Sequence, residues 1–289
     1  MHFKQKVKFL PIYLFSKLPL RFLFLLSDLG FIIVYYILNY RRNTVRENLI
    51  RSFPNMTEKE IKKLEKKFYR HFCNVFIEIL KSTTISEKEV RKRINVTNPE
   101  LITKYFDTGK SIIFYTSHQG NWEWLSLLPL FVPHQVTALY TPPSNGYFDE
   151  YMKMIRSRFG MICIEANKGY RTILKLNKNN VLTLNLIAGD QCPTQNSTKH
   201  WVRFLNQETC FSVGADRIAK KSNQVIIFPS YRKIKRGYYE IDLKLIHENP
   251  SIVSDNSIID SYAELLEKAI IDSPEMWLWS HKRWKIKRQ

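Results

Sequence analysis

The first strong pattern along the chain is an apolar stretch near its N-terminus. Residues 9–40 are dense in Leu, Ile, Phe and Tyr, and residues 22–38 form a run nearly long enough to cross a bilayer as a helix. The twelve Phe, Leu, Ile and Val residues of that run contribute about −5 kcal/mol on an insertion scale, and Asp28 near its middle costs about +3 kcal/mol. The pattern therefore favours membrane insertion by a narrow margin.

Basic residues flank this run on both sides, with Lys17 and Arg21 before it and Arg41 and Arg42 after it. The positive-inside rule consequently gives no orientation. Three interpretations stay open: a transmembrane helix, a helix that lies in the cytoplasmic leaflet, and a buried core helix. The N-terminus shows no short apolar stretch followed by a small-residue cleavage site, so we do not predict a removable signal peptide.

The next pattern is an amphipathic helix. Thr57 and Glu60 have the spacing of a capping box, and apolar residues then recur at helical spacing at Ile61, Leu64, Phe68, Phe72, Val75, Phe76 and Ile79. The opposite face is rich in Lys, which is typical of a surface that meets solvent or lipid headgroups.

From about residue 111 the chain alternates short apolar runs with helical stretches. Strands are predicted at residues 111–116, 136–140, 161–165, 181–188, 225–232 and 239–246, and helices at residues 122–130, 148–158, 170–176, 213–221 and 258–271. This alternation predicts an α/β fold, with a mostly covered mixed sheet and flanking helices, preceded by the apolar membrane helix and the amphipathic helix. We divide the chain into a membrane-association or transmembrane segment, residues 1–42, and a folded domain, residues 43–289.

Composition adds a strong positive charge. Lys and Arg number 45 against 26 Asp and Glu, a formal net charge of +19, which indicates an anionic partner such as nucleic acid, a phospholipid surface or a phosphorylated substrate. The four cysteines lie far apart without a C-x-x-C pair, so the pattern favours neither a disulfide framework nor a zinc site.

The candidate chemistry lies where the first predicted strand of the sheet turns into a helix, in Ser117-His118-Gln119-Gly120-Asn121-Trp122-Glu123. In open α/β sheets, the turn after a strand displays reactive groups. Glu123 would hold one ring nitrogen of His118 while the other takes a proton from a substrate hydroxyl. About 0.6 such His-x4-acid pairs are expected by chance from 7 His and 26 acidic residues, so a structural His beside a helix-start Glu is an open alternative.

Other chemistries lack their motifs. The remaining histidines show no metal-ligand spacing, so no metal is predicted. The sequence contains no Gly-x-Ser-x-Gly, no phosphate-binding glycine loop and no dinucleotide fingerprint, and it has only 9 glycines. We therefore expect neither a serine hydrolase nor a nucleotide-driven enzyme, and no cofactor.

Several segments together resemble the late (secondary) acyltransferases of lipid A biosynthesis, a branch of the lysophospholipid acyltransferase superfamily. The resemblance runs nearly end to end, through the apolar N-terminus and residues 46–54, 117–123, 190–191, 204–206, 214–219, 262–267 and 274–285. It implies a lysophospholipid-acyltransferase-like fold and transfer of a fatty acyl group from an acyl carrier protein or coenzyme A thioester to a hydroxyl of a lipid A precursor. It also implies that His118 is the general base, that Glu123 orients it, and that no acyl-enzyme forms.

The resemblance suggests four further site residues. Arg156 and Arg158 fall where related enzymes place basic residues, and they could bind acceptor phosphate or support an oxyanion; a solvated helix face is the alternative. Asp190 and Gln191 follow a predicted strand and could form the floor of the site, with a plain strand-end cap as the alternative. The tryptophans of the C-terminal segment, Trp277, Trp279 and Trp284, fit an interfacial belt, and core packing is the alternative for Trp277 and Trp279.

The expected partners are a thioester donor, an anionic lipid acceptor and a membrane, and the expected location is the bacterial inner membrane with the catalytic domain facing the cytoplasm. An acyltransferase for another membrane lipid, a lysophospholipid, aminolipid or glycolipid, is the nearest alternative. A basic, membrane-tethered nucleic-acid-binding module is the alternative from another class. It leaves His118 and Glu123 without a role and lacks a binding motif, so we expect no nucleic-acid partner.

Overall fold

A computed structural model describes residues 7–195 and 197–288. Within this part of the chain, seven strands form one sheet in the order β1-β9-β8-β2-β5-β3-β4, and β6 and β7 form a separate pair. Neighbours in the large sheet are parallel except for β8 and β9. Its strands are β1 (Ile94–Val96), β2 (Ile112–Thr116), β3 (Gln135–Tyr140), β4 (Ile162–Glu165), β5 (Thr183–Ala188), β8 (Val225–Lys235) and β9 (Tyr238–His247). The predicted α/β fold with a mixed sheet is confirmed.

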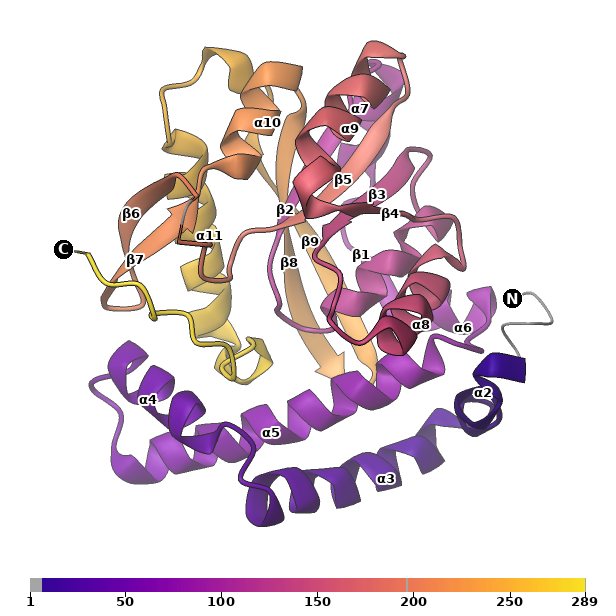
Figure 1. Ribbon diagram of the computed structural model, residues 1–289, viewed down its shortest axis with the longest axis vertical. Coiled ribbons are helices and arrows are strands. Elements are labelled where there is room, and N and C mark those ends of the chain that lie inside the picture. Colours follow the sequence, from indigo (N-terminus) through magenta and orange to yellow (C-terminus); the bar gives the residue numbers. More distant parts are fainter. Residues whose placement is uncertain (1–6, 196, 289) are drawn as a thin grey trace.

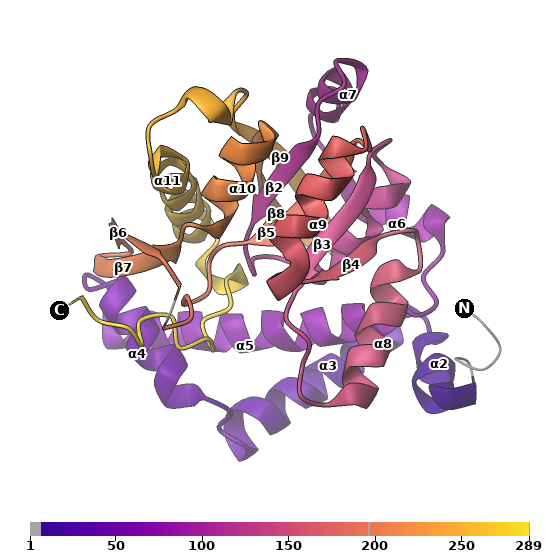
Figure 2. The same ribbon diagram turned by 45° about the horizontal axis from the view of Figure 1, so that its top comes forward.

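Helices cover both faces of the sheet. Successive side chains of a strand point to opposite faces, so each face has apolar side chains that helices bury. In β2, Ile113 and Tyr115 join a buried cluster with residues of α9 (Ala166–Lys178), α10 (Gly214–Ser222) and α11 (Ser257–Asp272). Ile112 and Phe114 join a second cluster with residues of α6 (Glu87–Arg93), α7 (Glu100–Asp107) and the 3₁₀-helix η2 (Trp122–Leu130). Figures 1 and 2 show α9 and α10 side by side over one face.

The long helix α5 (Glu58–Lys81) runs past the edge of the sheet at which β8 ends (Figure 1). Its capping box is present, since the Thr57 side chain accepts the Glu60 N–H and the Glu60 carboxylate accepts the Thr57 N–H. The shorter helix α4 (Arg42–Ser52) packs against α5. Together they lie under the loops that leave the strands, which is where the predicted site residues lie.

The apolar N-terminal stretch folds into α2 (Leu10–Ser16), α3 (Leu20–Ile32) and a π-helical turn η1 (Ile33–Ile37). Figures 1 and 2 show α3 lying along α5. Asp28 of α3 forms an ion pair with Arg236, which follows β8. The outer face of α3 and η1 leaves large apolar side chains exposed at Phe22, Leu25, Leu26, Leu29, Ile32, Ile33, Tyr36 and Ile37. The interpretation of residues 22–38 as a buried core helix is therefore wrong.

Among the described residues, Leu20–Ile37 is one stretch long and apolar enough to cross a membrane, and 33% of it is buried against the rest of the protein. The division of the chain after residue 42 stays a prediction, and residues 1–6 of the first segment lie outside the described residues.

All six predicted strands are present, and so are the five helices predicted after residue 111, including α8 (Gly146–Ser157). Residues 122–130 form a 3₁₀-helix with Pro129 inside it, a residue that removes a backbone donor. The sequence did not predict β1, α4, α6, α7 or the hairpin of β6 (Lys199–Phe204) and β7 (Gln207–Ser212). That hairpin turns at Leu205 and Asn206, both at positive φ, without the glycine that usually marks such a turn.

Candidate active site

The loop after β2 presents His118 two residues beyond the end of the strand. Gly120 has φ +63°, and a Cβ atom there would press against the ring of Tyr231, so glycine is required at this position. Asn121 caps η2 by accepting the Trp124 N–H, and its side-chain amide donates to Glu78 of α5 at 2.7 Å. The loop is thus fixed from both the sheet and α5.

Asp190 holds His118. Because β2 and β5 pair with Thr116 opposite Ala188, the residues two positions beyond each strand meet. The His118 Nδ1 atom lies 2.8 Å from Asp190 Oδ1, and the His118 backbone N–H donates to Asp190 Oδ2 at 2.9 Å. An ionised carboxylate only accepts hydrogen bonds, so Nδ1 carries the proton and Nε2 is left as the acceptor.

Glu123 has a different partner from the one we expected. Its carboxylate forms a two-bond ion pair with Arg156 of α8, at 2.8 Å from Nε and 2.6 Å from Nη2. The expectation that Glu123 holds a ring nitrogen of His118 is therefore corrected: Asp190 does so. The spacing of five residues misled because η2 carries Glu123 towards α8, whereas strand pairing brings Asp190 from 72 positions away.

The electrostatics of the pair follow from this geometry. Burial by itself lowers the pKa of His118, but the charge of Asp190 and its hydrogen bond outweigh burial, so the pKa of His118 is raised. Burial by itself raises the pKa of Asp190. The charge of His118 and three hydrogen bonds, from the His118 ring, the His118 backbone and Trp277, outweigh burial, so the pKa of Asp190 is lowered. Asp190 is consequently a carboxylate at neutral pH, and it favours the protonated form of His118.

The other predicted site residues separate into two groups. The Gln191 amide nitrogen lies 3.2 Å from His118 Nε2, where it donates to the free ring nitrogen. The Arg158 guanidinium donates instead to the carbonyl of Ser82, just past the end of α5, and it does not appear among the described residues that line the cavity. The structure therefore brings Asp190, Gln191 and Arg156 to the site, and it does not bring Arg158.

One residue near the site was not predicted to contact it. Trp277 is 2% exposed and Trp279 is fully buried, as the core-packing interpretation expects. The indole N–H of Trp277 also donates to Asp190 Oδ2 at 2.9 Å. No sequence signal pointed to this contact, because the two residues lie 87 positions apart.

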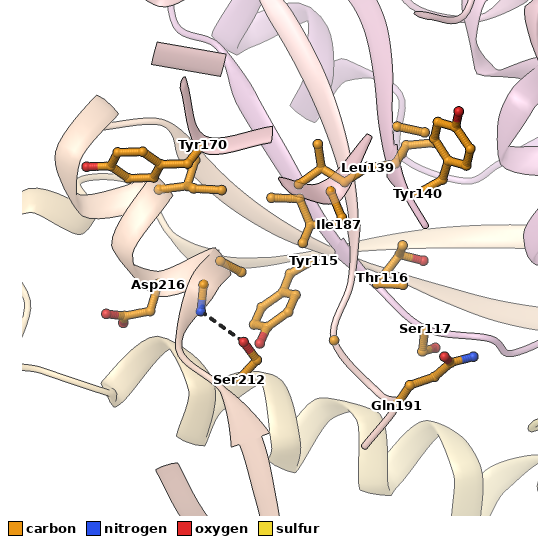
Figure 3. Close-up of a pocket in the computed structure, with 18 of the residues that line it drawn as sticks. Tyr115, Thr116, Ser117, Leu139, Tyr140, Tyr170, Ile187, Gln191, Ser212 and Asp216 are labelled. Atoms are coloured by element: carbon orange, nitrogen blue, oxygen red, sulfur yellow. Dashed lines mark hydrogen bonds between the residues drawn. The ribbon is translucent and has the colours of Figure 1, made fainter. Parts of the chain in front are cut away.

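His118 opens onto a cavity of about 1400 Å³ that runs between α9 and α10 over the sheet. Figure 3 shows Tyr115, Leu139 and Ile187 along its middle, Ser117 and Gln191 at one end, and Tyr170 and Asp216 at the other. The remaining lining residues include Trp122, Glu123, Leu125, Ala138, Arg156, Met161 and Leu186. The cavity thus combines apolar walls with His118 and the Glu123–Arg156 pair, and its volume exceeds that of most small-molecule sites.

Within residues 7–195 and 197–288, no group of three or more His, Cys, Asp or Glu side chains is arranged to hold a metal ion.

Comparison with known proteins gives a family. The sequence model described as "Bacterial lipid A biosynthesis acyltransferase" matches residues 9–286, nearly the whole chain. No curated protein matches at a significant level. Among solved structures, the 1-acyl-sn-glycerophosphate (LPA) acyltransferase PlsC from Thermotoga maritima is 17% identical, with 89% of this chain and 98% of that chain covered and a TM-score of 0.38.

Proposed function

The chain belongs to the family of bacterial lipid A biosynthesis acyltransferases, and from this premise we propose that it transfers a fatty acyl group from a thioester to a hydroxyl of a lipid A precursor, with His118 as general base. The observation that carries the proposal is the hydrogen bond between His118 Nδ1 and the buried carboxylate of Asp190. It leaves Nε2 unprotonated on the side that the Gln191 amide contacts. The acceptor hydroxyl takes the place of that amide.

The proposed step is direct transfer. The hydroxyl oxygen attacks the carbonyl carbon of the thioester while His118 Nε2 removes the hydroxyl proton. Asp190 stabilises the imidazolium that forms, and the same interaction raises the pKa of His118. The tetrahedral intermediate then collapses, the carbon–sulfur bond breaks, and the imidazolium returns its proton to the departing thiolate. An ester and a free thiol result, and no acyl-enzyme is needed.

We propose for Glu123 a role that differs from our first expectation, whereas the role proposed for Arg156 is the expected one. Glu123 uses both oxygens to hold Arg156 Nε and Nη2, so the guanidinium is fixed at the wall of the cavity. Among the described residues, Nη1 of Arg156 has no hydrogen-bond partner. We assign Arg156 to bind the oxyanion of the intermediate or a phosphate of the acceptor, and Glu123 to position it.

The cavity, the net charge and the exposed apolar face support the proposed substrates and the proposed location. The cavity has room and apolar walls for an acyl chain beside a lipid acceptor. The donor is a thioester of acyl carrier protein or coenzyme A, and either would meet a chain with a net charge of +19. We place the protein at the bacterial inner membrane, with residues 1–42 as the membrane segment and the catalytic domain facing the cytoplasm. The exposed apolar face of α3 and η1 supports this placement.

Purified protein incubated with labelled acyl donor and lipid A precursor tests the proposal. We expect His118→Ala to abolish transfer and His200→Ala to leave it intact. His200 is a matched control, because it forms a similar pair with Asp260 at 2.7 Å, is partly exposed, and is not one of the described residues that line the cavity. Full transfer by His118→Ala would contradict the mechanism. Transfer to a lysophospholipid but not to the lipid A precursor would replace the acceptor and keep the mechanism.

A further inference from the structure

The C-terminal segment after α11 is joined to the His118 loop by backbone hydrogen bonds. The Gly120 N–H donates to the Met276 carbonyl at 3.0 Å, and the Leu278 N–H donates to the His118 carbonyl at 3.1 Å. Gln119 and Trp277 form an antiparallel bridge between these two bonds. The segment therefore runs as a short extra strand beside the loop that carries the proposed base.

The same segment is fixed at its far side. The Asn48 amide of α4 donates to the carbonyls of Trp279 and His281, at 2.8 and 2.9 Å. The His281 ring accepts the Cys192 N–H at 2.9 Å, so the segment also holds the loop that carries Gln191. Burial lowers the pKa of His281 to about 4, so its ring is a neutral acceptor at physiological pH. The segment is thus clamped between α4 and the two loops of the site.

Trp277 lies at the centre of this clamp and contacts the carboxylate of Asp190 directly. Its indole N–H donates to Oδ2 at 2.9 Å, the same oxygen that accepts the His118 backbone N–H at 2.9 Å. Oδ1 is thereby left for His118 Nδ1 at 2.8 Å. Both Trp277 and Asp190 are 2% exposed, so the indole N–H donates to a carboxylate that bulk water does not reach.

We propose that Trp277 is a positioning residue of this enzyme, which orients the Asp190 carboxylate so that one oxygen always faces the His118 ring. The inference rests on the proposed roles of His118 and Asp190 and extends them to a third residue. Trp277 touches neither substrate nor the reacting atoms. It acts by fixing the rotation of the carboxylate, which in turn fixes which ring nitrogen is free to accept a proton.

Trp277→Phe tests the proposal, because phenylalanine keeps an aromatic ring in the core and removes only the N–H donor and part of the ring volume. We expect kcat per folded protein to fall roughly ten- to hundredfold, the range for losing a hydrogen bond to a buried charge, with KM for both substrates unchanged. We also expect the acid limb of the kcat–pH profile to move to higher pH. With one donor fewer, Asp190 attracts the proton of His118 more strongly.

Trp284→Phe is the matched control. Its indole N–H donates to Thr209 Oγ1 at 2.7 Å, in the same C-terminal segment but without contact to Asp190. We expect this variant to lose stability without any change in the pH profile. Trp277→Met, a large and flexible apolar side chain without an N–H or O–H donor, is the second variant if Trp277→Phe does not fold.

His118→Ala and Asp190→Ala are measured in the same series to separate the two levels of the argument. If both abolish transfer while Trp277→Phe keeps wild-type kcat and an unmoved pH profile, the positioning role of Trp277 is overturned and the proposed function stands. If neither alters transfer, the proposed roles of His118 and Asp190 fail, and if the wild-type protein transfers no acyl group, the proposed function itself fails. A loss in Trp277→Phe that appears only as lower thermal stability, with unchanged kcat per folded protein, also overturns the positioning role.

Discussion

Replacing Asp190 with asparagine tests whether Asp190 or Glu123 is the acid that acts on His118. The substitution keeps the shape of the side chain and turns one oxygen into an amide that donates. Asp190 Oδ2 accepts two N–H groups, from the His118 backbone and Trp277, whereas Oδ1 accepts one, from His118 Nδ1. In Asp190→Asn the remaining side-chain oxygen will therefore occupy the Oδ2 position, because only this orientation satisfies two buried donors.

The amide nitrogen then faces His118 Nδ1, and two donors cannot face one another. His118 must shift its proton to Nε2, the nitrogen that has to accept the proton of the acceptor hydroxyl. The variant also lacks the charge that stabilises the imidazolium. In a Ser-His-Asp triad the corresponding wrong tautomer costs on the order of 10⁴ in kcat, and we expect Asp190→Asn to lose on the order of 10³–10⁴ here with little change in KM.

The assay is steady-state transfer of a labelled acyl group to the lipid A precursor, with thermal unfolding measured in parallel to show that the variant is folded. Glu123→Gln is the comparison, since glutamine keeps one oxygen for Arg156, loses the second hydrogen bond to it, and leaves the His118 tautomer unchanged. We expect this variant to lose far less activity. The reasoning would be refuted by an Asp190→Asn enzyme within tenfold of wild type, or by Glu123→Gln as the more damaged of the two.

Two further predictions concern pH and the support beneath the loop. Because the base must be unprotonated and the pKa of His118 is raised, kcat should fall as the pH drops through a value above the ordinary 6.5; a kcat–pH profile with its acid limb at or below 6.5 would contradict this. Glu78→Ala leaves the buried donors of Asn121 and Tyr239 without their acceptor and should lower the free energy of unfolding by roughly 2–4 kcal/mol. Glu78→Gln keeps an acceptor for both donors and should lose less, as denaturant titration of the three proteins would show; an alanine variant as stable as wild type would refute the role of this contact.

Hydrophobic pattern was sufficient to predict the strands that form the centre of the sheet. The runs at residues 112–116, 183–187 and 225–228 are buried from both sides, so they appear as mostly apolar segments. The β6–β7 hairpin was not predicted, because its strands are only partly buried and its turn lacks glycine. Residues 122–130 were placed correctly but form a 3₁₀-helix, since the pattern of apolar residues does not distinguish the two kinds of helix there.

Most of the candidate site residues lie together, Arg158 being the exception, but their pairing differs from the expected one. His118, Glu123, Asp190 and Gln191 were all named from the sequence, and all four lie at or beside the cavity. Which acid contacts the histidine depends on strand order, because β5 lies next to β2 only through the crossover that places β3 and β4 beyond it. Local spacing favoured Glu123, whereas the register of β2 on β5 brings Asp190 to the ring.

The most direct test of the central claim is the protonation state of His118 in the folded enzyme, measured by NMR with ¹⁵N-labelled histidine and assigned by its absence in His118→Ala. The proposal predicts a ring protonated at Nδ1 and bare at Nε2 above its pKa, and a pKa above 6.5 that coincides with the acid limb of kcat. A ring protonated at Nε2, or a titration that does not coincide with the loss of acyl transfer, would contradict the claim that Asp190 holds His118 as the base of this reaction.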